Sequence, residues 1–210
     1  MSNESAQATE RPRAADRILK SARELFYAQG IRAVGVDEIV THAGVAKPSL
    51  YRSFPSKDQL AASYLELYEA EFWARFDGAL GPDTDDPRRQ LLDYLTVLGH
   101  RAQAAGYRGC GLSNAVIEYP EAGHPARRVA EAHKRKFRAR LHRMAKQMGA
   151  SDPAFLGDAL MLLIEGAFSS GQLFRGPGPA ESLVRAASLL IDAAAGRPEG
   201  SEPERARSRG

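Results

Sequence analysis

Apolar residues recur along the chain with a helical period of 3.6, and period-2 alternation of the kind found in β-strands is absent. In the first such segment, Ile18, Ala22, Leu25 and Phe26 fall on one face of a helix. Read with the glycine and proline breaks, the pattern predicts nine helices, over about residues 14–29, 36–43, 47–54, 56–77, 88–105, 112–119, 125–148, 153–175 and 180–195. The sequence therefore predicts an all-α protein.

Composition places the chain among ordinary globular proteins. Its 210 residues, 43% hydrophobic and 26% charged, are enough to bury a sizeable core. Residues 1–12 and 197–210 are rich in Glu, Pro, Ser and Arg, so we expect disordered tails there. No window approaches about 18 uncharged apolar residues, and the start has no apolar h-region, so neither a membrane span nor a secretory signal is expected.

Charge is unevenly distributed behind a net value of +3. Residues 11–60 and 101–149 are basic, whereas residues 61–100 are acidic. Such asymmetry indicates that different parts of the chain face different partners. The single cysteine, Cys110, cannot form an internal disulfide and fits a reducing cytoplasm.

Residues 35–54 have the pattern of a helix–turn–helix, with a short helix, a turn at Gly44 and a second short helix. In DNA-binding versions of this motif, the second helix lies in the major groove and its exposed side chains meet base edges and phosphates. In this chain those exposed residues are Lys47, Pro48, Ser49, Tyr51 and Arg52. Arg52 suits a bidentate contact with guanine, whereas Lys47 and Tyr51 suit phosphates.

Lys57 stands at the start of the next predicted helix, where a cation opposes the helix dipole at a cost of about 0.3–1 kcal/mol. A phosphate bound at that N-terminus would offset the cost, because it would pair with Lys57 and the free N–H groups together. A simpler interpretation stays open, in which Ser56 and Asp58 cap the helix and Lys57 is a solvated surface residue.

Residues 18–60 closely resemble the N-terminal domain of the TetR family of bacterial transcriptional regulators. The matching core, turn and surface positions are Ala22, Phe26, Gly30, Val36, Ile39, Ala43, Gly44, Val45, Lys47, Leu50, Tyr51, Phe54, Lys57 and Leu60. The resemblance implies phosphate contacts by Tyr51 and Lys57, and base contacts by Lys47, Pro48, Ser49 and Arg52.

Two positions depart from the family pattern. Many members have Ser or Thr where this chain has Val34 and Gly35, and many have Ser where Ala46 stands. A side-chain cap is therefore lost at the start of each helix of the motif, although Gly35 still leaves its backbone N–H accessible to a phosphate.

Beyond residue 77 the resemblance extends only to the family's general plan, in which a divergent helical domain dimerises and often binds a small molecule. We therefore predict a DNA-binding domain over residues 13–60 and a ligand-binding and dimerisation domain over residues 61–196. Apolar faces with small residues within 153–175 and 180–195 predict a two-fold homodimer interface, although packing within the subunit also uses some of these residues.

Polar residues in apolar surroundings predict a pocket between the fourth, fifth, seventh and eighth helices. The polar candidates are Tyr68, His100, Tyr107, Asn114, His133, Glu165 and Gln172, and the apolar candidates are Phe72, Phe137 and Phe168. Each residue alone fits ordinary core or surface better than a pocket. Glu165 is the most suggestive, because a buried carboxylate needs a partner, either a cationic ligand or an internal arginine or histidine.

Other chemistries find little support. The segment 111–115 is not a nucleophile elbow, and the histidines at 124, 133 and 142 lack the i, i+4 spacing of a helical zinc site. No catalytic residue, cofactor or metal site is therefore predicted. The basic segment 126–148 is interpreted as a helix with one apolar stripe and a solvated charged face. A redox-sensing role for Cys110 stays open.

The sequence thus predicts a cytoplasmic, homodimeric regulator that binds a pseudo-palindromic double-stranded DNA operator. We expect it to repress transcription until a small-molecule effector releases it from the operator. The alternative is a helical interaction protein whose turn motif no longer binds DNA.

Overall fold

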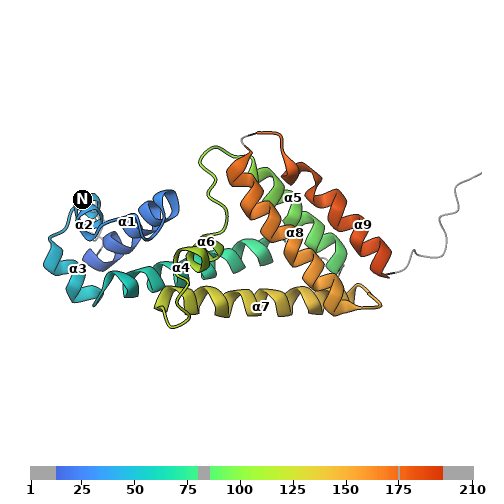
Figure 1. Ribbon diagram of the computed structural model, residues 1–210, viewed down its shortest axis with the longest axis horizontal. Helices are drawn as coiled ribbons and strands as arrows, with labels where there is room; N and C mark the ends of the chain where they lie inside the picture. Colours follow the sequence, from blue (N-terminus) through green and yellow to red (C-terminus); the bar gives the residue numbers. More distant parts are fainter. Residues whose placement is uncertain (1–12, 80–85, 175, 196–210) are drawn as a thin grey trace, which may run out of the picture. The chain divides into compact units, whose positions relative to one another are not determined.

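The structure, a computed structural model of the chain, describes residues 13–79, 86–174 and 176–195. This part of the chain holds nine α-helices, one short 3-10 helix and no strand (Figure 1). The helices are α1 (Ala14–Gln29), α2 (Val36–Ala43), α3 (Lys47–Ser53), α4 (Lys57–Gly78), α5 (Pro87–Ala102), α6 (Gly111–Glu118), α7 (Pro125–Gln147), α8 (Pro153–Leu173) and α9 (Leu183–Ala195), with the 3-10 helix η1 (Pro179–Ser182) before α9. The all-α prediction is confirmed, whereas both predicted tails lie outside the described residues.

The chain divides into two compact units. One comprises the residues up to Glu71 together with Cys110–Ala132, and the other comprises Phe72–Gly109 and the residues from His133 onward. Helices α4 and α7 therefore each contribute to both units. This division follows contacts rather than function, so the functional boundary between residues 60 and 61 stays a prediction.

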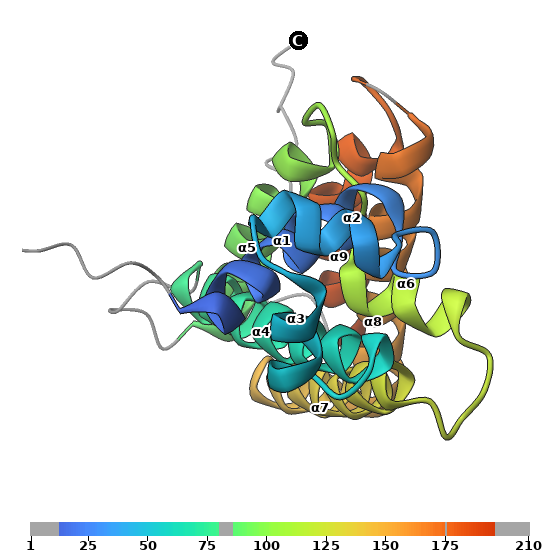
Figure 2. The same cartoon turned by 90° about the vertical axis from the view of Figure 1, so that its left-hand side faces the viewer.

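In the first unit, α1 packs against α2 and α3 (Figure 2). Ile18, Ile39 and Leu50 supply one fully buried side chain from each of these helices. Gly44 makes the turn between α2 and α3 in the left-handed region, at φ 61°, where its N–H donates to the carbonyls that end α2. Because glycine adopts this conformation without steric cost, the two short helices can meet at a sharp angle.

In the second unit, α5, α8 and α9 pack against one another (Figure 1). Aromatic side chains form the core of this unit. Phe76 and Phe137 are fully buried, with ring centroids 5.5 Å apart. The apolar stripe predicted within the basic segment is confirmed for His133, Phe137, Leu141 and Met144, which are all buried on α7.

Helix α8 is the one described helix that is long and apolar enough to cross a membrane, by length and composition only. The sequence expectation of no membrane span counted only uncharged runs of residues. Helix α8 did not meet that criterion, because it carries Asp158 and Glu165. Both carboxylates are paired, Asp158 with Arg138 at 2.6 Å and Glu165 with Lys134 at 2.5 Å. Core and interface helices of soluble proteins have the same composition.

Candidate nucleic-acid interface

Helices α2 and α3 begin without side-chain caps. Gly35 precedes α2 and Ala46 precedes α3, and neither supplies a side-chain hydrogen bond to the helix that follows. The loss of both caps, predicted from the sequence, is confirmed. Pro48 lies in the first turn of α3, where a missing N–H costs the helix nothing.

The predicted contact residues of α3 are on the surface, whereas Leu50 anchors the helix from beneath. Leu50 is fully buried, and Lys47, Pro48, Tyr51 and Arg52 are exposed. Half-buried Ser49 accepts a hydrogen bond from Nη2 of Arg52 at 3.0 Å. The structure therefore presents cations, hydroxyls and an aromatic ring together, which are the groups that bind phosphates and base edges.

Lys47 is paired with a residue that the sequence did not single out. Its Nζ lies 2.8 Å from Oδ1 of Asp37, in the first turn of α2. The hydrogen bond to Asp37, followed by the charge of its carboxylate, raises the pKa of Lys47. The two residues are ten positions apart on different helices, so only the relative placement of α2 and α3 reveals the pair.

Lys57 is half-buried rather than fully solvated. Its Nζ donates to the carbonyl of Arg32 at 3.2 Å, and burial lowers its pKa. The cap predicted for α4 is confirmed, because the N–H of Gln59 donates to Oγ of Ser56 at 3.1 Å. A phosphate contact by Lys57 stays a prediction.

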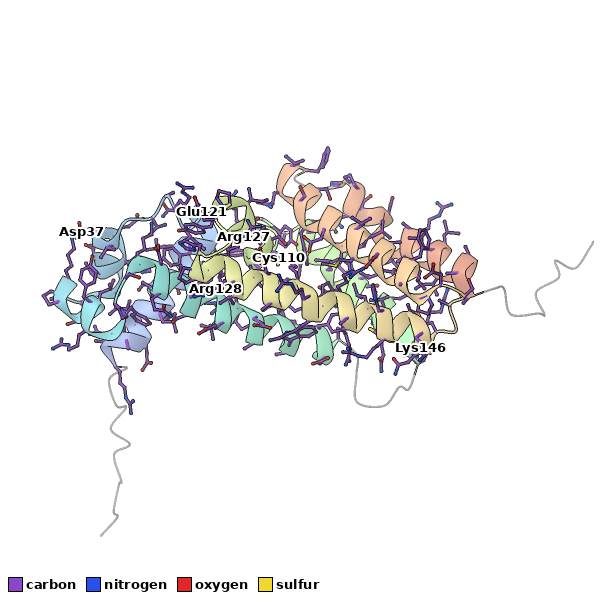
Figure 3. The ribbon with its side chains drawn as sticks, turned by 60° about the horizontal axis from the view of Figure 1, so that its bottom comes forward. Asp37, Cys110, Glu121, Arg127, Arg128 and Lys146 are labelled. Atoms are coloured by element: carbon purple, nitrogen blue, oxygen red, sulfur yellow. The ribbon has the colours of Figure 1, made fainter. Side chains whose placement is uncertain are left out.

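The end of α6 holds the loop between α1 and α2. The backbone N–H of Arg32 donates to Oε2 of Glu118 at 2.8 Å, and the guanidinium of Arg32 donates to the Glu118 carbonyl at 3.0 Å. Arg127 of α7 donates to the carbonyls of Val116 and Tyr119, which fixes the same end of α6 (Figure 3). Arg32 and Glu118 are 86 residues apart, and no pattern in the sequence predicted their contact.

A polar cleft of about 350 Å³ lies beside this anchor. Its lining residues are Arg32, Lys57, Asp58, Tyr119, Glu121 and His124. The rings of Tyr119 and His124 are stacked, with their centroids 3.7 Å apart. Nε2 of His124 lies 3.4 Å from Oδ1 of Asp58. Burial, followed by the charges of Asp58 and Glu118, raises the pKa of Tyr119 to about 12. The contacts among Asp58, His124 and Tyr119 therefore connect the start of α4 to the end of α6.

Two of the predicted ligand contacts lie in the first unit. Tyr68 is buried, with its ring stacked on Tyr27 at 6.2 Å, and burial raises its pKa. Half-buried Asn114 lies on α6, one turn after buried Cys110. A Cβ added to Gly111 would lie 2.6 Å from the Tyr64 hydroxyl, so α4 and α6 are in close contact here.

The other eight lie in the second unit. Phe72, His133 and Phe137 are buried together, with the Phe72 ring 4.5 Å from His133 and 5.1 Å from Phe137. Tyr107 packs against α8, and His100 is exposed in the last turn of α5. The fold therefore brings Phe72, His133 and Phe137 together, whereas His100 faces solvent.

Glu165 has a cationic partner within the protein. Lys134 donates to it at 2.5 Å and also lies 5.2 Å from the centroid of the Phe168 ring. Gln172 donates to the Phe168 carbonyl at 3.3 Å. The structure thus supplies a lysine, which was not among the partners considered from the sequence. Within the described residues, no group of three or more His, Cys, Asp or Glu could hold a metal ion.

Comparison with known proteins identifies the relatives of this arrangement. The family model described as bacterial regulatory proteins, tetR family, matches residues 18–64. A crystal structure of a TetR-family transcriptional regulator from Streptomyces coelicolor is similar with a TM-score of 0.81 and 31% identity, covering 87% of this chain and 96% of that one. The HTH-type transcriptional regulator YjdC of Escherichia coli is 24% identical over 83% of this chain and 91% of its own length. The HTH-type transcriptional activator FasR of Mycolicibacterium smegmatis is 34% identical over 43% of this chain and 42% of its own length.

Proposed function

Because the chain belongs to the TetR family of DNA-binding transcriptional regulators, we propose that it is a homodimeric repressor released from its operator by a small molecule. The observation that carries the proposal is the exposed group on α3, which is held outward by buried Leu50. The proposal places the protein in the cytoplasm, where its operator is, and assigns it no reaction.

On the operator, α3 lies in the major groove. Lys47, Pro48, Ser49 and Arg52 face base edges, whereas Tyr51, Lys57 and the N–H of Gly35 contact phosphates. Tyr51 supports this assignment, because a large aromatic side chain that is 47% exposed on a short helix is available to a partner. In a two-fold dimer, the two copies of α3 would read half-sites about 34–36 Å apart on a pseudo-palindrome.

The outward face of α8 supports the homodimer. Phe155, Leu162 and Leu173 are 65%, 73% and 73% exposed, and their spacings of seven and eleven residues place them on one side of the helix. Leu189 of α9 is also exposed, and α8, η1 and α9 line a groove of about 360 Å³. Exposed apolar surface of this kind is typical of an interface, and the proposed occupant is a second copy of the chain.

The effector acts by shifting the dimer between two forms. A ligand that prefers the form with the wrong half-site spacing lowers operator affinity by its own preference, typically about 1–3 kcal/mol. The proposed contacts are the residues predicted from the sequence, among which buried Phe72, His133 and Phe137 offer an aromatic surface. Linkage requires operator DNA to weaken effector binding by the same factor.

The test is to sequence genomic fragments retained by the purified protein, and then to measure gel shifts on them. We expect a salt-sensitive complex on a pseudo-palindrome. Arg52→Ala should relax sequence preference, whereas Lys57→Ala should weaken all duplexes about equally. Reporter transcription with and without the protein then gives the sign of regulation, since the similar FasR is an activator by name. A protein that folds correctly but retains no duplex at low salt would instead be the helical interaction protein.

A further inference from the structure

Asp37 places a carboxylate on the surface that the proposed function offers to DNA. It lies in the first turn of α2 (Figure 3) and its side chain is 80% exposed. Its Oδ1 lies 2.8 Å from Nζ of Lys47. A carboxylate is favourable at a helix N-terminus, which explains why α2 tolerates it. Phosphates, however, repel a carboxylate in a DNA interface, unless a cation or a base amino group faces it.

The pair sets a hydrogen-bond donor beside an acceptor at a defined spacing. In the major groove, a G·C base pair presents guanine O6, an acceptor, next to cytosine N4, which keeps one hydrogen facing the groove. These two atoms are themselves hydrogen-bonded, at about 2.9 Å. The spacing of the Lys47 and Asp37 groups therefore matches that of the O6 and N4 atoms.

We propose that Asp37 and Lys47 read one G·C base pair in each half-site as a unit, with Lys47 donating to guanine and Asp37 accepting from cytosine N4. The inference rests on the proposed function, because it requires α3 in the major groove. Guanine is preferred over thymine opposite Lys47, because it offers N7 beside O6 whereas thymine carries a methyl group beside O4. In a reversed C·G pair, the donor Lys47 would face the donor N4 of cytosine, and the acceptor Asp37 would face the acceptor O6 of guanine.

The first experiment is selection from a random duplex library with the full chain and three variants. Asp37→Ala and Lys47→Ala should each lose G·C enrichment at the same single position of the half-site and keep the others. Glu38→Ala is the matched control, because Glu38 is an exposed carboxylate in the same turn that accepts from Gln29 instead. Its selected sequence should equal that of the unaltered protein.

The second experiment tests the cytosine contact itself. A selected duplex with N4-methylcytosine at that position lacks the groove-facing hydrogen, and should bind the unaltered protein about fivefold or more weakly. The same methyl group should leave the affinity of Asp37→Ala unchanged. Thermal unfolding of each variant checks that this exposed substitution leaves the fold intact.

The outcomes separate the two proposals. If the unaltered protein selects a sequence that Asp37→Ala selects equally well, the base-reading pair is refuted and the regulator stands. A loss spread evenly over all positions, or equal weakening of both proteins by the methyl group, also refutes it. If the unaltered protein enriches no duplex, the proposed function itself fails, and the pair fails with it.

Discussion

Two lysine–carboxylate pairs, one in each unit, share the same chemistry but lie in different surroundings. Lys47 and Asp37 are 48% and 80% exposed, whereas Lys134 and Glu165 are 16% and 30% exposed. An exposed pair contributes only about 0–1 kcal/mol, because water competes for both partners. Separating a largely desolvated pair costs more, because it leaves a charge without compensation.

This difference shows where the molecule can exchange partners. The first pair is exposed and can contact DNA without leaving a buried charge uncompensated, so it lies where a ligand is expected. The second pair is largely buried, with Lys134 against the ring of Phe168. Its contacts hold α7 against α8. On the proposed function, the same residue types therefore serve recognition in one unit and packing in the other.

The largest expected effect comes from the exposed face of α8. Leu162→Glu should prevent dimerisation and lower operator affinity by about 100-fold or more, because the two half-sites are no longer bound together. Val97→Glu is the matched control, since Val97 is a 46% exposed apolar residue on α5. Light scattering and gel shifts measure the two effects. A dimeric Leu162→Glu protein with full operator affinity would place the interface elsewhere.

The comparison of the two pairs is tested directly by removing each lysine. Lys134→Ala should lower the free energy of unfolding by about 1–3 kcal/mol, because Glu165 loses the ammonium group of Lys134 in a half-buried site. Lys47→Ala should leave it nearly unchanged, because water replaces the lost contact. Urea unfolding of both variants gives the two values, and equal values would show that the surroundings of the pairs do not matter.

Much of the fold could be predicted, because the residues that end its helices act locally. Gly30 ends α1 and Gly44 ends α2, each at positive φ, as their residue type and position indicated. The start of α9 was less well predicted, since Pro179–Ser182 forms a 3-10 helix rather than the first turn of an α-helix. Hydrophobic spacing does not distinguish these two geometries over four residues.

The surface of the interface could also be predicted, because outward residues of a short helix follow from its buried ones. Contacts between residues far apart in the sequence could not be predicted. Glu118 reaches Arg32 across 86 residues, and Lys134 lies in a segment interpreted as a solvated face. Sequence reveals that Glu165 needs a partner, but which cation reaches it depends on how α7 and α8 are aligned.

The anchor between Glu118 and Arg32 should have a smaller effect than the Lys134 pair. Glu118→Ala removes the acceptor of the Arg32 N–H at the surface, and should lower the free energy of unfolding by about 0.5–1.5 kcal/mol. Hydrogen exchange of the loop between α1 and α2 should accelerate, because the loop loses one of its two hydrogen bonds to the end of α6. Glu121→Ala, in the neighbouring loop, serves as the control, and the same exchange rates in both variants would contradict the anchoring role.

The smallest effect concerns acid stability of the exposed cluster on α7 and α8. Hydrogen bonds from Arg138 and then from His142 hold the pKa of Asp158 well below its usual range. A carboxylate with a depressed folded pKa contributes stability that is complete above its unfolded pKa of about 3.9, and that is lost as the pH falls further. The stability difference between the unaltered protein and Asp158→Asn should therefore be present at about pH 5 and shrink as the pH falls below about 4. Urea midpoints over this range measure it, and Arg138→Gln, which removes the main cause of the shift, should behave similarly. A difference that persists unchanged at pH 2.5 would mean that Asp158 stabilises α8 through shape rather than charge.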